Sequence, residues 1–125
     1  MLMTNATVLL VENYEPLRTL YTQALEDEGY TVLPASDGEE ALDWARVVEP
    51  DVVVLEPSPE DKEAWSHLMQ VARRAPIIWN TGRPDFRDRA QAMGVTFLLK
   101  SSDVDALCQQ VAATLRRATN AHRAA

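Results

Sequence analysis

The sequence predicts an α/β domain in which one doubly wound parallel sheet of five strands carries helices on both faces. Two almost uninterrupted apolar segments, 6–11 and 52–55, are typical of strands buried on both sides. Three more short apolar segments, at 30–35, 76–80 and 95–99, alternate with stretches whose apolar residues recur at helical spacing. Strands that alternate with helices through short connections require a parallel sheet with right-handed crossovers. The flavodoxin-like strand order 2-1-3-4-5 is the simplest solution.

Local signals place the first two helices of this arrangement. Pro16 lies in the first turn of one helix, where its missing N–H removes no hydrogen bond, and Gly29 ends that helix. Asp37 and Glu40 resemble a capping box and predict the start of the next helix, which ends before Pro50.

The remaining three helices also have recognisable ends. Ser58 as a cap, followed by Pro59 and two acids, predicts a third helix that begins early, near Pro59. Gly94 is expected to end the fourth helix, and Ser101 or Ser102 to cap the fifth. The inward side chains of the fourth helix are expected to be Phe86, Ala90 and Met93.

Length and composition indicate one domain over residues 1–117, followed by a flexible C-terminal tail over 118–125. The chain is 46% hydrophobic and 25% charged, and no apolar run approaches the roughly 18 residues of a membrane span. No signal-peptide pattern opens the sequence, so a cytoplasmic location without membrane contact is expected. The formal net charge of -7 argues against direct nucleic-acid binding by the domain. The single cysteine, Cys108, is expected in the core.

Polar residues follow four of the predicted strands at the point where each strand ends. Glu12 and Asn13 follow the first strand and Glu56 the third, while Thr81 and Lys100 end the fourth and fifth. Because the carboxyl ends of parallel strands meet at one edge of a sheet, these five residues are expected to converge. The first and third strands flank the switch point of the predicted order, so this edge is the candidate functional site.

Three short sequence motifs accompany this pattern: Glu-Gly-Tyr at 28–30, Asp-Gly-Glu-Glu-Ala-Leu at 37–42 and Pro-Asp-Val-Val-Val-Leu at 50–55. Over residues 6–117 the chain resembles the receiver domain of two-component response regulators. The resemblance implies an acid pair at Glu12 and Asn13 and a phosphoacceptor position at Glu56. It also implies a switch hydroxyl at Thr81, a switch aromatic at Phe97 and an invariant-type lysine at Lys100.

The departures from the family pattern fall where the chemistry would occur. Glu56 replaces the phosphoacceptor aspartate, and Glu12 with Asn13 replaces a pair of acids. Mg²⁺ requires near-octahedral oxygens at about 2.0–2.1 Å, so one lost carboxylate and two lengthened ones predict weak or absent binding. Glu12, Glu56 and Ser58 are the weak candidates for a metal site, and no cofactor is expected. Standard aspartyl phosphorylation is therefore not expected.

Simpler interpretations stand beside these. Lys100 is also explained as a neutralising partner of the nearby acids, and Thr81 as a strand-end hydroxyl that bonds to backbone. Trp79 and Asn80, which precede Thr81, have no explanation at the level of sequence.

Three functional hypotheses follow. The leading one is a non-enzymatic signalling module that works by protein–protein contact with a kinase, an effector or another signalling protein. The second is a phosphorelay receiver that accepts phosphate on Glu56 with Mg²⁺. The third, a small-ligand binder on a flavodoxin-like fold, is disfavoured because no glycine-rich phosphate loop follows the first strand.

Two further expectations concern how the module would act. Glu56 is expected to serve as a fixed negative charge that draws Lys100 and Thr81 and lets Phe97 turn inward. The resemblance implies a homodimer surface formed by the fourth helix, fifth strand and fifth helix, with mixed charges at Arg83, Arg87, Arg89, Arg116, Asp85, Asp88, Asp103 and Asp105.

Overall fold

The computed structural model describes residues 6–101 and 103–124, the last three of these as backbone only. Its five strands form one parallel sheet in the order β2-β1-β3-β4-β5, as the sequence predicts. The strands are β1 Thr7–Val11, β2 Thr31–Ala35, β3 Val52–Leu55, β4 Ile77–Thr81 and β5 Thr96–Leu99. The α-helices are α1 Glu15–Asp27, α2 Gly38–Val47, α3 Lys62–Val71, α4 Arg87–Met93 and α5 Val104–Ala124.

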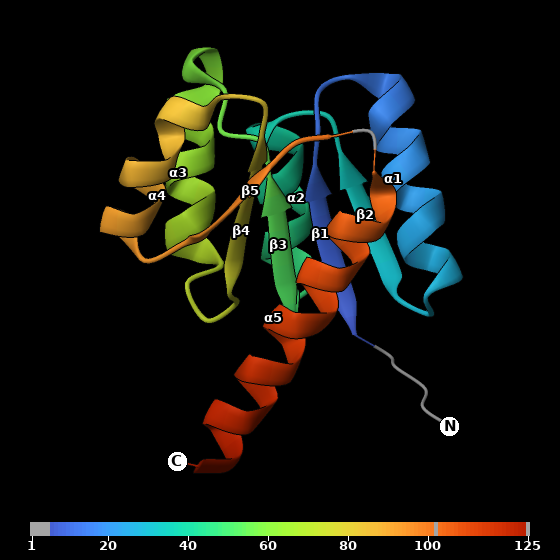
Figure 1. Ribbon diagram of the computed structural model, residues 1–125. Helices are drawn as coiled ribbons and strands as arrows, with labels where there is room; N and C mark the ends of the chain where they lie inside the picture. The colour runs from blue at the N-terminus through green and yellow to red at the C-terminus, as the bar shows by residue number, and fades with distance from the viewer. Residues whose placement is uncertain (1–5, 102, 125) are drawn as a thin grey trace.

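The helices cover both faces of the sheet (Figure 1). Helices α2, α3 and α4 pack on one face, and α1 and α5 on the other. Because side chains alternate along a strand, Leu9 of β1 joins the first core while Val8 and Leu10 join the second. The central strands β1 and β3 are buried on both sides, which fixes the sheet register and aligns the strand ends that carry the candidate site.

The first core explains Trp79, which the sequence left unexplained. Trp79 is fully buried, and its ring lies 5.6 Å from that of Trp65 and 6.0 Å from that of Phe86 between ring centres. The 77° angle between the indoles of Trp65 and Trp79 is the edge-to-face arrangement that aromatic rings favour. Trp79 is therefore a central packing residue of the face covered by α2, α3 and α4.

Several predicted helix ends are confirmed. Pro16 lies in the first turn of α1, and Gly29 and Gly94 follow α1 and α4 with positive φ angles of 99° and 73°. Asp37 caps α2 by accepting a 2.9 Å hydrogen bond from the backbone N–H of Glu40. These residues end and start helices for the reasons that the sequence indicates.

The start of α3 differs in detail from the prediction. Helical structure does begin at Pro59, but as a 3-10 turn over Pro59–Asp61, and the α-helix starts at Lys62. Ser58 does not act as a side-chain cap, because its hydroxyl donates to the Glu60 carboxylate at 3.1 Å. The Asp61 carboxylate instead accepts a 2.6 Å bond from the N–H of Gly38, which ties the start of α3 to the start of α2.

One prediction for the last two helices is wrong, one is refined, and the flexibility of the expected tail stays a prediction. Met93 is not inward but nearly half exposed, since it is the last residue of a helix of only seven. The expected tail continues α5 as helix to Ala124, in a segment without glycine or proline. The start of α5 is capped by Asp103, which accepts from the N–H of Asp105 at 3.0 Å, while Ser101 accepts from the N–H of Asp103. Ser102 lies outside the described residues.

The limit of the domain at residue 117 stays a prediction. No helix in the described part of the chain is both long and apolar enough to span a bilayer.

Gly38 allows α2 and α3 to approach closely, which generates a stability prediction. A Cβ at this position would lie 2.8 Å from the Cβ of Ala64 and 2.9 Å from the backbone nitrogen of Trp65. We expect Gly38→Ala to lower the free energy of unfolding by about 1–3 kcal/mol, because overpacking outweighs the helix propensity of alanine. Urea unfolding measures the change. Gly82→Ala is the matched control, since a Cβ there meets nothing within 4 Å; equal stability in both variants would contradict the close-packing argument.

Candidate functional site

The candidate site lies where β1, β3, β4 and β5 end. Backbone hydrogen bonds align these ends: the N–H of Glu56 donates to the carbonyl of Val11 at 3.1 Å, and that of Lys100 to the carbonyl of Thr81 at 2.8 Å. Each polar residue is thus the first one beyond a strand, or the last one in it. The predicted convergence of Glu12, Glu56, Thr81 and Lys100 at one edge is what this register produces.

The centre of the site is an ion triad formed by Glu12, Lys100 and Glu56. The Lys100 ammonium donates to Glu12 Oε1 at 2.7 Å and also to Glu56 Oε1. Glu12 is only 1% exposed, so its carboxylate depends on partners within the protein in place of water. With two carboxylates and one ammonium, the triad carries a formal charge of -1. The simple interpretation of Lys100 as a neutralising partner therefore describes its contacts.

Both ends of Glu12 are held in place. Its second carboxylate oxygen accepts from the backbone N–H of Tyr14 at 3.0 Å, and its backbone carbonyl accepts from the Arg18 guanidinium at 2.9 Å. A buried carboxylate whose oxygens are both hydrogen-bonded is satisfied without a metal ion.

The triad controls the protonation of its lysine. Burial by itself would lower the pKa of Lys100, but the hydrogen bonds and charges of Glu12 and Glu56 outweigh it and raise the pKa above the ordinary 10.5. Tyr21 of α1 adjoins the triad and shares a hydrogen bond with Asn80 of β4. Burial raises the pKa of Tyr21, and this hydrogen bond opposes the rise.

Thr81 and Asn13 do not join the triad. The Thr81 hydroxyl oxygen accepts from the backbone N–H of Arg83 at 3.2 Å, and Thr81 and Glu56, both described, share no hydrogen bond. This corrects the expectation that Glu56 draws Thr81. Glu56 binds the Lys100 ammonium instead. Asn13 is exposed and lines, with Glu56, a depression of about 250 Å³.

Phe97 is half-buried against the core covered by α2, α3 and α4. The Arg87 guanidinium lies 4.6 Å from the centre of its ring, a cation–π contact that ties β5 to α4.

The weak metal candidates are largely engaged by protein groups. The Ser58 carbonyl accepts from the Trp65 indole N–H at 2.8 Å and from the backbone N–H of Asp61 at 3.0 Å. One oxygen each of Glu12 and Glu56 binds Lys100. Among the described residues, no group of three or more His, Cys, Asp or Glu side chains is placed to hold a metal ion.

Sequence reasoning missed three parts of this site. Asn80 is an unusual residue for the end of a buried strand, and its bond to Tyr21 supplies the reason. Tyr21 itself looked like an ordinary apolar-face residue of α1, and only its hydroxyl gave a clue. The bond from Trp65 to the Ser58 carbonyl has no sequence signal, because Trp65 also fits the apolar face of α3.

Comparison with known proteins identifies the family. The family model of the response regulator receiver domain matches residues 8–112. The chain belongs to this family. The receiver domain is 36% identical over 88 residues to the alkaline phosphatase synthesis transcriptional regulatory protein PhoP of Bacillus subtilis, covering 68% of this chain and 37% of PhoP. It is 30% identical over 124 residues to the transcriptional regulatory protein TrcR of Mycobacterium tuberculosis, covering 94% of this chain and 48% of TrcR.

Solved structures agree with this assignment. The response regulator TrrA of Thermotoga maritima, in complex with Mg²⁺-BeF, superimposes with a TM-score of 0.74 at 26% identity, over 87% of this chain and 98% of that one. The receiver domain of a Luxo repressor protein from Vibrio parahaemolyticus gives a TM-score of 0.80 at 26% identity, over 97% and 98%. The receiver domain spans about half the length of the curated relatives TrcR and TcrX.

The triad predicts an alkaline dependence of stability. The folded-state pKa of Lys100 is raised, so its stabilising effect is complete below about pH 10 and is lost as the pH rises through the raised value. We expect Lys100→Met to lower the free energy of unfolding by about 3 kcal/mol at neutral pH, because it leaves two adjacent carboxylates unpaired. We also expect the variant to lose less stability than the wild type between about pH 9 and 11.5.

Urea unfolding across that pH range measures both effects. Lys62→Met, at an exposed lysine of α3, is the matched control and should follow the wild type. A wild-type curve parallel to that of Lys100→Met would show that the triad contributes no proton-linked stability.

Proposed function

We propose that this receiver domain, acting in the cytoplasm, signals through protein–protein contact without a standard aspartyl-phosphate cycle, and that Glu56 serves as a fixed negative charge. The observation that carries the proposal is the triad, in which Lys100 binds Glu12 and Glu56 together. The glutamate side chain is one carbon longer than that of aspartate, and here that length is used to reach Lys100. The residue that would otherwise meet a phosphoryl group is thus already paired with Glu56, while the triad as a whole keeps a formal charge of -1.

The same contacts argue against a Mg²⁺-dependent reaction. Phosphoryl transfer needs a metal ion to neutralise charge and to align oxygens. To bind here, the ion would have to compete with the Lys100 ammonium and the Tyr14 N–H for carboxylate oxygens and with two donors for the Ser58 carbonyl. Asn13 offers only a neutral amide where a second acid would help.

The effect of the fixed charge is smaller than that of a phosphoryl group. Phosphorylation adds about -1.5 to -2 of charge and three acceptor oxygens, whereas Glu56 supplies one charge and two oxygens. Glu12 shares Lys100, and Thr81 bonds to the backbone of Arg83 instead of to Glu56. Any bias toward an active-like surface is therefore modest and permanent, and it is transmitted through Lys100 and not through Thr81.

The partners on this proposal are proteins: a kinase, an effector or another signalling protein. PhoP and TrcR are named as transcriptional regulatory proteins, so an output that reaches transcription through a partner is consistent with the family. The net charge of -7 disfavours nucleic acid as a direct ligand of this domain.

Treatment with a small-molecule phosphodonor tests the proposal. We expect wild-type protein incubated with acetyl phosphate and Mg²⁺ to show no phosphoryl adduct by intact mass, and calorimetry to detect no Mg²⁺ binding tighter than about 1 mM. The double variant Asn13→Asp/Glu56→Asp is the matched comparison. It restores two acids of the family pattern and should gain Mg²⁺ affinity by about tenfold.

A stoichiometric adduct on Glu56 in the wild type would overturn the proposal in favour of phosphorelay. If the double variant folds but gains no Mg²⁺ affinity, the bonds to the Ser58 carbonyl, and not the acid pattern, exclude the metal.

A homodimer that forms through α4, β5 and α5 is a second proposal. Part of the expected charge pairing is already used within the chain, because Arg83 pairs with Asp85 at 3.0 Å and Arg87 stacks on Phe97. The contact would therefore depend on Leu99, an exposed residue of the edge strand β5. We expect light scattering to show a weak dimer that phosphodonors do not change and that Leu99→Asp abolishes. Leu20→Asp, at a similarly exposed leucine of α1, is the control. Only monomer at high wild-type concentration would refute the dimer.

A further inference from the structure

Exposed apolar side chains gather at the end of the sheet opposite the triad. Six large hydrophobic residues are exposed in the described part of the chain, and three of them lie at the C-terminal ends of three helices. These are Val47 on α2, Val71 on α3 and Met93 on α4, which are 75%, 41% and 47% exposed. Single exposed apolar residues are ordinary, but a group on neighbouring helices marks an interaction surface. We call this group, with the arginines described below, the helix-end surface.

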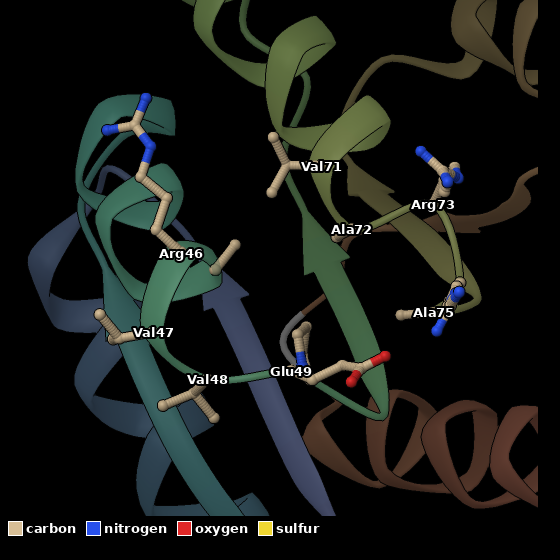
Figure 2. Close-up of a pocket in the computed structure, with 11 residues that line it drawn as sticks. Arg46, Val47, Val48, Glu49, Val71, Ala72, Arg73 and Ala75 are labelled. Atoms are coloured by element: carbon tan, nitrogen blue, oxygen red, sulfur yellow. The ribbon is translucent and has the colours of Figure 1, made fainter.

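Two hollows run between these helix ends. One, of about 400 Å³, lies between the end of α2 and the end of α3 (Figure 2). In Figure 2, Arg46 and Val47 come from the α2 side, and Val71 and Arg73 from the α3 side. The other, of about 550 Å³, lies between α3 and α4, where Met69 and Met93 line it. Arg73 lines both, so the two hollows adjoin at the end of α3.

The charge of this surface is opposite to that of the chain. Three arginines line the hollows, Arg46, Arg73 and Arg74, against one acid, Glu49. Among the described residues Arg73 and Arg74 have no ion-pair partner, and Arg46 has only the exposed Asp43 at 3.4 Å. On a chain with a net charge of -7, Arg73 and Arg74 are cations without an ion-pair partner beside apolar side chains. Arginine and methionine, both present here, are among the residues enriched at protein interfaces.

We propose that the helix-end surface binds an acidic segment of a partner protein, with apolar side chains of the segment in the two hollows and its carboxylates on Arg73 and Arg74. A protein segment fits better than nucleic acid, because Val47, Val71 and Met93 offer nothing to a phosphate backbone. The inference adds a binding surface to the proposed role in protein contact. It is independent of the charge at Glu56, since residues 49–50 and 75 precede β3 and β4, whereas Glu56 follows β3.

The test uses a synthetic peptide of about 15 residues that repeats leucine at helical spacing among glutamates. Binding is followed by amide chemical shifts of the ¹⁵N-labelled receiver domain. We expect shifts centred on Val47, Val71 and Arg73. Arg73→Glu/Arg74→Glu and, separately, Val47→Asp should each weaken binding by about tenfold.

Matched variants control for charge and for apolar loss elsewhere. Arg116→Glu/Arg117→Glu makes the same charge change on exposed residues of α5, and Leu20→Asp removes an exposed leucine of α1. Both should bind the peptide as the wild type does, and so should Glu56→Gln. A loss of binding in Glu56→Gln would show that the surface depends on the triad, which refutes its independence.

Two twin peptides and a DNA duplex complete the experiment. A twin with lysine for glutamate and a twin with serine for leucine should not bind. The inference is overturned if the lysine twin binds equally well, if a DNA duplex binds and the acidic peptide does not, or if the shifts map to another face. It is also overturned if the acidic peptide causes no shifts at about 1 mM.

Discussion

The ammonium of Lys100 lies between two carboxylates at the edge of the sheet, and this pairing gives the buried Glu12 side chain an oppositely charged partner. An unpaired carboxylate at that depth would cost several kcal/mol, so the ends of β1, β3 and β5 are tied to one another by charge. The lysine cannot serve as a mobile partner for an incoming group without leaving two acids unpaired. The ammonium that stabilises the strand ends is thus also the one that an incoming group would need.

The fold could be predicted because its causes are local. The buried strands, Gly29, Gly94 and Asp37 act through backbone geometry that nearby residues determine, and the strand order follows from short right-handed connections. The errors arose where a local sequence signal was overridden by another interaction or by helix propensity. Ser58 is a good cap by residue type, but its hydroxyl donates to Glu60 instead. The end of α5 lacks an apolar stripe, yet it contains no residue that would stop a helix.

The sequence predicts which residues form the candidate site, but not which of them contact one another. Strand ends reveal that Glu12, Glu56, Thr81 and Lys100 meet, because parallel strands share an edge. They do not reveal that Lys100 and not Thr81 reaches Glu56, since that depends on side-chain length and on the backbone donor at Arg83. The bond between Tyr21 and Asn80 joins residues on α1 and β4, and such contacts between distant segments leave no pattern in either one.

The bond from the Trp65 indole to the Ser58 carbonyl gives the protein an optical property. Trp65 is nearly buried and lies against Trp79, while its N–H reports on the loop that follows β3. A molecule that pulls this loop toward Glu56 must break the indole bond and change the polarity that the ring senses. The Trp65 component of the intrinsic fluorescence, beside those of Trp44 and Trp79, therefore reports on this loop without an attached dye.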